Sequence, residues 1–440
     1  MAHLVGPGPL VDRSLPQLGV SIRVLWWVVA ATALSAATFG VVCTTLVLQG
    51  PAASDDSSPL AAVGSLHRAE ASVRRAEEPR TVAGHDVNCT AGNYSTTTLK
   101  LLAEQPLAAL LAGMSPASEP QWATAPPSLS HFEASGVSAV AGSTDMFVIF
   151  DNTYRIGRVA NGVPSLAAGS LAAAAAGAEA PPSRFITWPG DDGADSEFEG
   201  ITYNTTSGHY LIMQEAVVNG SGALVTRILE VSLDGGEATV HSTCDGTMAF
   251  ESANKGMEGA AIATAADGNS YLLGLCEGNG CAKGKAGRKP GGGRVVVMQR
   301  VTTAACGCAW VPVQTVAIPP SAAFQDYAAI SIFNNSRVAV LSQENAAVWV
   351  GDLDLLDGGT DSNGQRSLFG LSGDTVFDFP RNNRCERIYC NVEGIHWQSP
   401  DTLIAVSDMM KAGGKQSFVC QDHDQSIHTF QDPGRVPVKE

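Results

Sequence analysis

An internal repeat constrains the fold of this chain of 440 residues more than any other feature. Five short segments share one pattern, in which an acidic or small residue and then a second small residue precede a β-prone run. They are SGVSAV at Ser135, EGITYN at Glu199, EGAAIA at Glu258, AAISIF at Ala328 and EGIHWQ at Glu393. The second residues stand at 136, 200, 259, 329 and 394, so the spacings are 64, 59, 70 and 65. Such self-similarity indicates a repeat architecture.

Each repeat continues with three more short apolar runs. The second run always ends in an acid, at Asp151, Glu215, Glu277, Glu344 and Asp408. Third and fourth runs follow, among them QSFVCQ at Gln416 and SIHTFQ at Ser426 in the last unit. Four strands per unit, separated by turn residues, are typical of β-propeller blades. The sequence therefore predicts an all-β fold, a five-bladed β-propeller of four-stranded blades over residues 129–440.

Other architectures fit the pattern less well. A parallel sheet needs crossovers of a dozen or more residues, usually helical, and no convincing helix separates the strands. A β-sandwich would not explain five copies of one pattern. The segment Thr98–Met114 has leucines at helical spacing but a proline in its middle, so we expect a broken helix at the edge of the domain.

Residues 24–48 carry no charge over 25 positions, which is enough for a helix to cross a hydrocarbon core of about 30 Å. The stretch exceeds the apolar part of a cleaved signal peptide, about 7–15 residues. Arg13 and Arg23 precede it, whereas Asp55 and Asp56 follow it. The positive-inside rule then predicts a type II single-pass protein, with a cytosolic tail (1–23), a transmembrane signal anchor (24–48), a disordered stalk and domain-edge segment (49–128) and a lumenal or extracellular propeller (129–440).

Glycosylation and disulfides are expected on that side of the membrane. All five sequons lie after the span, at Asn88, Asn93, Asn204, Asn219 and Asn334. Nine of the ten cysteines also follow it, and an oxidising compartment favours disulfides. The spacings Cys276 to Cys281 and Cys385 to Cys390 suit local loop staples. Because nine is odd, one thiol should be free or paired between chains.

The composition of the chain and the absence of several catalytic motifs exclude some classes of function. The net charge of −16 should repel phosphate backbones, so nucleic acid is not an expected partner. No GxSxG, HExxH, Walker loop or GxGxxG after a strand is present. His396 is expected to pack in an inner strand, and Asp422-His423-Asp424 is expected to form a solvated turn.

Acidic side chains are the main candidates for chemistry. The first strand of each blade lines a propeller's channel, so we expect acids of these strands and of the positions just before them to converge there: Glu133, Glu199, Glu258, Asp326 and Glu393. Calcium, with about six to eight oxygen ligands, would relieve their repulsion. Alternatively, these acids accept backbone hydrogen bonds that hold the blades in register. The acids that end the second strands are expected at turns on one rim, either in turn hydrogen bonds or as a ligand-facing ring.

The motifs SEFEGITYN at Ser196, NKGMEGAAIAT at Asn254, CNVEGIHW at Cys390 and the SGV opening at Ser135 resemble the SdiA-regulated (YjiK-like) propeller family, a relative of NHL-type propellers. The resemblance covers nearly all of 133–431 and implies five blades, a bound calcium and a bacterial envelope background. The fourth repeat departs from the pattern, because Ala328 and Ala329 replace the acid and the glycine. A weaker resemblance to phytase-like esterase domains would imply an enzyme.

Two functions remain open at this point. The first is a non-enzymatic, calcium-binding recognition or scaffold module for an unknown protein or small-molecule ligand. The second is a calcium-dependent phosphoesterase with its site at the channel mouth, where the ion would polarise a substrate oxygen. The enzyme would need cationic groups for a phosphate close to the acids.

Overall fold

The computed structural model describes residues 97–432, except 112–130, 140–144, 161–182, 191–193, 304–306, 361–363, 365, 383 and 411–417. The predicted span 24–48, the stalk before residue 97, Asn88 and Asn93 lie outside the described residues. No helix among the described residues is long and apolar enough to cross a membrane. Apart from Thr303, the described residues belong to one compact unit, Glu77–Thr302 with Gly307–Glu440, which is nearly all β.

The strands form antiparallel meanders whose order in the sheet follows the chain. One sheet contains β2 (Ala134–Ala139), β3 (Met146–Phe150), β4 (Ile156–Val159) and β5 (Arg184–Ile186). Another contains β14 (Ala329–Phe333), β15 (Arg337–Ser342), β16 (Ala347–Leu355) and β17 (Phe369–Asp378). These strands contain the apolar runs of the first and fourth repeats.

An eight-stranded sheet combines two further meanders. The first consists of β6 (Phe198–Asn204), β7 (His209–Val218), β8 (Leu224–Ser232) and β9 (Thr239–Phe250). The second consists of β10 (Met257–Thr264), β11 (Ser270–Cys276), β12 (Arg294–Thr303) and β13 (Gly307–Ala317). Strands β13 and β9 join them by a short parallel pairing of Ala309 with Asp245 and Trp310 with Gly246.

The last sheet differs from the prediction. Its order is β1 (Lys100–Pro106), β20 (Ser426–Gln431), β19 (Thr402–Ser407) and β18 (Val392–Ser399). The segment before residue 129 therefore contributes its outer strand, followed by the short helix α2 (Leu107–Leu111), and the broken-helix prediction was wrong. The strand predicted at Gln416 was also wrong, because Phe418–His423 forms the 3-10 helix η5. The remaining short helices are η3 (Asn279–Cys281), α3 (Gly284–Gly287) and η4 (Pro320–Ala322).

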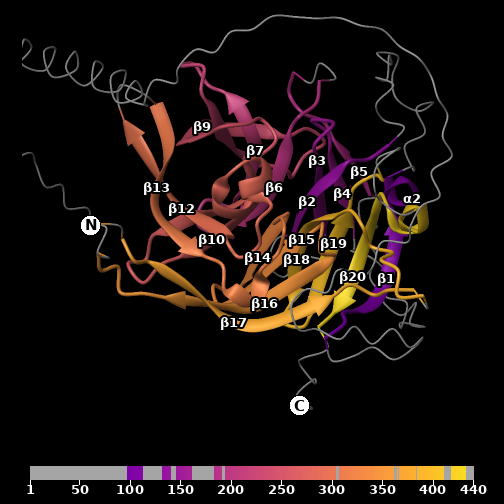
Figure 1. The fold of residues 1–440 in the computed structure, drawn as a ribbon. Helices are drawn as coiled ribbons and strands as arrows, with labels where there is room; N and C mark the ends of the chain where they lie inside the picture. The colour runs from indigo at the N-terminus through magenta and orange to yellow at the C-terminus, as the bar shows by residue number, and fades with distance from the viewer. Residues whose placement is uncertain are drawn as a thin grey trace, which may run out of the picture. The chain divides into compact units, whose positions relative to one another are not determined.

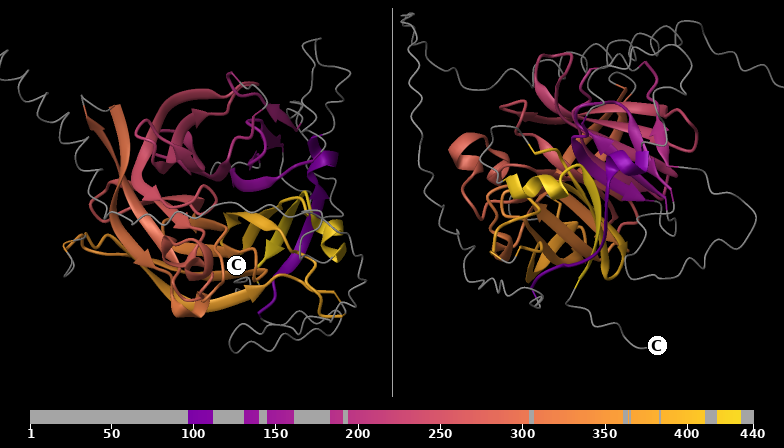
Figure 2. Two further views of the ribbon diagram at one scale, coloured as in Figure 1. Left: turned by 45° about the horizontal axis from the view of Figure 1, so that its top comes forward. Right: turned by 90° about the vertical axis from the view of Figure 1, so that its right-hand side faces the viewer.

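The first strands of the meanders contact one another in a closed circuit, β2 to β6 to β10 to β14 to β18 and back to β2. Figure 1 shows these strands gathered in the middle of the unit, with the later strands of each meander farther out, and Figure 2 gives two further views. A Cβ on Gly200 would lie 2.7 Å from the Ala260 nitrogen, and one on Gly394 would lie 2.8 Å from Gly136 Cα. The small residue of the repeat thus permits close approach of neighbouring first strands. This arrangement is consistent with a β-propeller.

The hydrophobic core lies between neighbouring meanders. Each cluster of buried apolar side chains draws from two of them, as with Ile149 and Ile212 or Leu273 and Trp349. The cluster that contains Val148 also contains Val406, so the meander of β18 packs on that of β2. Apolar packing follows the same closed circuit as the first strands.

Three disulfides join described cysteines to one another. Cys276 is bonded to Cys281, as the spacing predicts. Cys390 is bonded to Cys420, so the predicted staple between Cys385 and Cys390 was wrong. Distance along the chain is a weak guide here because η5 returns to the start of β18.

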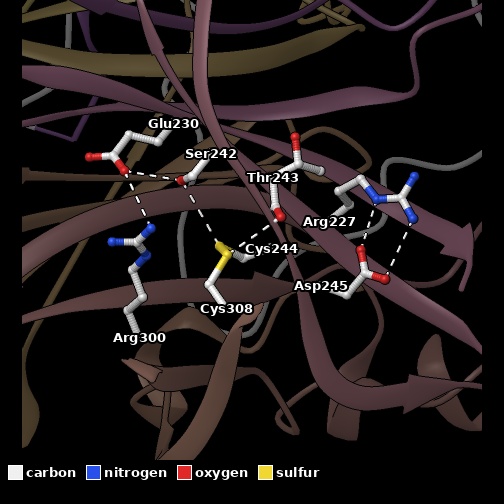
Figure 3. The surroundings of a disulfide bond; sticks show 8 residues. All are labelled: Arg227, Glu230, Ser242, Thr243, Cys244, Asp245, Arg300 and Cys308. Carbon is white, nitrogen blue, oxygen red and sulfur yellow. Dashed lines mark hydrogen bonds and ion pairs between the residues drawn. A yellow bond between two sulfur atoms is a disulfide. The ribbon is translucent and has the colours of Figure 1, made fainter. Parts of the chain in front are cut away.

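The remaining disulfide, between Cys244 and Cys308, joins β9 to β13. Figure 3 shows it beside the ion pair of Arg227 with Asp245, at 2.8 Å between Nε and Oδ1. The bond lies next to the parallel pairing of these two strands and therefore links the two meanders of the eight-stranded sheet covalently.

Candidate functional site

A β-bulge recurs at the start of four of the first strands. The register shifts between Ala134 and Gly136, Phe198 and Gly200, Met257 and Gly259, and Val392 and Gly394. The bulged residues are therefore Ser135, Glu199, Glu258 and Glu393, the first residues of the repeats. A bulge re-aims a side chain, so the glycine and the acid of each repeat have separate roles: the glycine permits close packing and the acid is redirected.

The first strands enclose a narrow cavity of about 10 Å³, about the size of one water molecule. Ser135 and Glu199 line it, together with the small residues Gly136, Gly200, Gly259, Ala329 and Gly394. The second residues of all repeats thus meet at one place. No side chain larger than alanine comes from those five positions, and Glu199 is the one acid among the residues that line the cavity.

Glu199 and Glu258 are held in a strongly unfavourable environment for charge. Burial raises the pKa of Glu199 well above its usual value, and the charges of Glu258 and Glu393 raise it further. Burial also raises the pKa of Glu258, with a further increase from Glu215. Glu199 is only 9% exposed, and no described residue donates a hydrogen bond to its carboxylate. This carboxylate is therefore buried among like charges without a protein donor.

The closest grouping of acids combines the two sets from the sequence. Carboxylate oxygens of Glu215, Glu258 and Glu277 all lie within 4.8 Å of one another. Gly256 donates its N–H to Glu215 Oε1 at 2.7 Å, and Lys255 Nζ binds both carboxylate oxygens of Glu277. Burial raises the pKa of Glu215 to about 7, even though the Gly256 hydrogen bond lowers it.

The other predicted channel acids have protein partners. Glu393 accepts a hydrogen bond from the Gln343 amide, and Glu133 lies 3.7 Å from His131. Asp326 accepts hydrogen bonds from the Ser342 hydroxyl and from the Glu344 N–H, at 3.1 and 3.0 Å to its two oxygens. Burial raises the pKa of Asp326 to about 6. Asp326 therefore takes the structural role in the fourth repeat.

The acids that end the second strands share a backbone contact. Their N–H groups bond to the carbonyl of the residue three before the repeat's small residue: Asp151 to Glu133, Glu215 to Glu197, Glu277 to Gly256 and Asp408 to Asn391. At Glu344 the Asp326 carboxylate replaces that carbonyl. Glu215 and Asp408 are almost fully buried, at 4% and 1% exposed, whereas Glu344 lies nearer the surface, 3.8 Å from Arg288. Of these acids, Glu215 and Asp408 thus lie in the interior of the unit and Glu344 lies near its surface.

The donor atoms fit a hard cation. Glu215, Glu258 and Glu277 offer only oxygens, which Ca²⁺ and Mg²⁺ prefer over nitrogen and sulfur sites. Glu199 adds a fourth carboxylate, on which the charges of Glu258 and Glu215 act. A divalent ion would neutralise Glu199, Glu215 and Glu258, whose ionisation burial opposes. Lys255 and Gln343, which the repeat pattern does not mark, complete the surroundings.

A second polar cluster lies at the sheet of β1. His428 Nε2 is 2.6 Å from Ser407 Oγ, and His428 Nδ1 is 2.9 Å from Glu104 Oε2. The connectivity is that of a Ser-His-acid triad, but His428 and Ser407 are 0% and 1% exposed. His423 Nδ1 also lies 2.9 Å from Glu104, so the solvated turn predicted there was wrong. The cluster ties β1 to its neighbours rather than presenting a nucleophile.

His396 behaves as the sequence predicts. Burial lowers the pKa of this histidine to about 4, which leaves it neutral near pH 7. It lies on β18 opposite Ile404 of β19. A packing role fits this position better than that of a general base.

Comparison with known proteins does not identify a family for this chain. No known protein family matches the chain, and neither does any curated protein. Among solved structures, it is similar to the PQQ-bound form of an aldose sugar dehydrogenase from Streptomyces coelicolor, with a TM-score of 0.32 and 11% identity over 68% of this chain and 94% of that one. An oxidoreductase (glucose dehydrogenase) from Thermus thermophilus gives a TM-score of 0.29 and 10% identity, over 67% of this chain and 98% of that one. At such TM-scores the likeness carries no argument, so the statement on the fold depends on the strand pairing above.

Proposed function

We propose that this protein is a membrane-anchored, calcium-binding β-propeller of five blades that serves as a recognition or scaffold module. The observation that carries the metal site is the convergence of Glu215, Glu258 and Glu277, whose oxygens lie within 4.8 Å of one another. Beside them, Glu199 is buried with no described hydrogen-bond donor. These four side chains would hold the ion, which would neutralise their charge and bind the meanders of β6 and β10 together.

The closed circuit of first strands and shared cores supports five blades. On this reading the eight-stranded sheet is two blades joined at β9 and β13, and β1 is the outer strand of the last blade. Membership in the SdiA-regulated family is part of the proposal and comes from the repeat motifs of the sequence.

A calcium-dependent phosphoesterase is the second candidate, and one observation favours it. Lys255 binds Glu277 of the acid cluster, and Arg288 lies 3.8 Å from Glu344, another acid that ends a second strand; phosphate binding would require such cationic groups. However, the one Ser-His-acid arrangement found among the described residues is buried at β19 and β20. We therefore prefer a protein that binds its ligand without hydrolysing it. Calcium-dependent hydrolysis of a panel of phosphomonoesters by the full-length protein, absent from a Glu258→Gln variant, would reverse this preference.

Calorimetric titration of calcium into the chelator-treated, full-length protein in detergent micelles tests the metal site. The comparison is with a Glu199→Gln, Glu258→Gln double variant, and the matched control is Glu237→Gln, Glu386→Gln, which alters two exposed glutamates. We expect binding by the wild type and the control, and at least about tenfold weaker binding by the channel variant, since each lost charge weakens Coulomb attraction. No heat of binding with the folded wild type would refute the site.

Anchoring and glycosylation are separate parts of the proposal. Residues 24–48 would hold the protein in the membrane, with the propeller lumenal or extracellular. Carbonate extraction of membranes should leave the chain in the pellet, and a chain lacking residues 24–48 should be released. Asn204, Asn219 and Asn334 are next to or within turns between strands, where a glycan can extend into solvent. Endoglycosidase treatment should reduce the apparent mass, and Asn→Gln changes at these positions should reduce that shift stepwise.

A further inference from the structure

Lys255 occupies an unusual place for a lysine in this protein. It lies in the turn between β9 and β10, and its Nζ binds both oxygens of Glu277. Glu277 is one of the three acids whose oxygens converge. The side chains of Lys255 and Glu277 are 27% and 21% exposed. The side chain of Lys255 is thus partly exposed, and its ammonium group is bound to one member of the acid cluster.

The charge of Lys255 reaches the whole cluster. It acts favourably on the ionised forms of Glu215 and Glu258 as well as on its partner Glu277. Glu199, outside this group of three, is also buried with no described hydrogen-bond donor, and the charges of Glu258 and Glu215 raise its pKa further. One ammonium group therefore faces three carboxylates, one buried and two half-buried, which leaves the site short of positive charge.

We propose that Lys255 is a tethered counter-ion that competes with a divalent cation for the acid cluster, so that the bound metal displaces its ammonium group from Glu277. This inference depends on the proposed metal site. An ammonium and a divalent ion repel strongly within a few ångströms of each other in a partly buried setting. The flexible four-carbon stem of a lysine lets the charge move outward, while the Gly256 N–H still binds Glu215 and holds the backbone of the turn.

The competition sets the affinity of the site. While Lys255 is on Glu277, a metal ion must displace it, so the metal binds more weakly than the carboxylates alone would allow. Once displaced, the ammonium becomes available to solvent or to an anionic group on a ligand. Metal occupancy would then change the charge presented at this surface.

Calcium chloride alone, titrated into the full-length protein in micelles, tests the competition. Lys255→Met keeps the length and apolar stem but removes the charge, and we expect it to bind calcium about tenfold more tightly than the wild type. Lys255→Arg should bind like the wild type. Lys283→Met is the matched control, because Lys283 is 54% exposed and pairs with Glu251 at 3.8 Å, and it should leave the affinity within about twofold.

A second measurement needs no variant. Acetylation of amines in the wild type, followed by peptide mass spectrometry, should modify Lys255 faster with calcium than without it, relative to Lys283. An unchanged Lys255 rate in protein that binds calcium would overturn the displacement.

The outcomes separate the two proposals. Wild-type binding with equal or weaker binding by Lys255→Met overturns the competition and leaves the metal site standing. If Lys255→Met binds calcium and the wild type does not, Lys255 excludes the ion from the wild-type site, which supports the competition. Absence of binding by both folded proteins overturns the metal site and the competition together.

Discussion

His428 Nδ1 on β20 lies 2.9 Å from Glu104 Oε2 on β1, so a side-chain contact across 324 residues joins the last described strand to the first. His423 adds a contact of 2.9 Å to the same carboxylate. The backbones of β1 and β20 also pair along their length. Glu104 therefore holds β1, the outer strand of the last sheet, against β20.

Glu104→Gln should destabilise the protein in a pH-dependent way. Burial opposes ionisation of Glu104, but hydrogen bonds from His423 and His428 lower its pKa to about 2. A lowered carboxyl pKa gives stability that is present above the unfolded value near 4.5 and is lost as the pH falls toward 2. We expect Glu104→Gln to lose about 2 kcal/mol at pH 7, as for a hydrogen bond to a charged group.

Urea unfolding at pH 7, 5 and 3 measures this effect, with Glu386→Gln as the control. The difference from the wild type should shrink at pH 3. Because burial lowers the pKa of His428 as well, the wild type should itself lose stability below about pH 6.5. A difference that stays constant from pH 7 to 3 would show that the charge of Glu104 is irrelevant to β1.

Gly394→Ala tests the closure of the circuit of first strands. A Cβ there would lie 2.5 Å from Val406 Cγ2 and 2.8 Å from Gly136 Cα, so the strands β18 and β2 would have to separate. Such overpacking should lower the free energy of unfolding by about 1–3 kcal/mol. Gly220→Ala is the control, since a Cβ at Gly220 meets nothing within 4 Å. Equal stability of the two variants in urea would argue against contact between β18 and β2.

Removal of the Cys244–Cys308 disulfide should destabilise the protein more than removal of Cys276–Cys281. The sequence separations are 64 and 5 residues, and loop-closure entropy gives about 4 and about 2 kcal/mol respectively. Paired Cys→Ala variants, unfolded in urea side by side, measure both losses. The opposite order would mean that the link between β9 and β13 contributes little beyond the parallel pairing there.

The sequence predicts most strands because each repeat carries its own pattern. The acid, the small residue and the apolar runs are local signals, and they place the strands from β2 to β20 well. The outer strand of the last sheet, β1, is different. In Leu99–Leu111 the leucines suit a helix, and nothing local indicates that Lys100–Pro106 pairs with a strand more than 300 residues later. The 3-10 helix at Phe418–His423 is likewise fixed by Cys420 and by contacts with Glu104.

The sequence predicts only those residues of the candidate site that recur from repeat to repeat. Glu199, Glu258 and Glu393 occupy equivalent positions in their repeats, which predicts that they converge but not that Gln343 binds Glu393 or that Glu215 and Glu277 approach Glu258. Lys255 stands four residues before Gly259, where the other repeats have Phe132, Ser196, Gln325 and Cys390. A residue that occurs in one repeat alone gives no periodic signal. Its role follows from the fold of the turn between β9 and β10, which brings it to Glu277.

Direct location of the ion tests the central claim most sharply. Crystals of the protein grown with calcium, measured at a long wavelength, would give an anomalous difference map. We predict one peak at about 2.3–2.6 Å from oxygens of Glu215, Glu258 and Glu277, the distance range of calcium ligands. A well-ordered structure in millimolar calcium with no peak among these carboxylates, or with the Lys255 ammonium still bound to Glu277 beside them, would contradict the account.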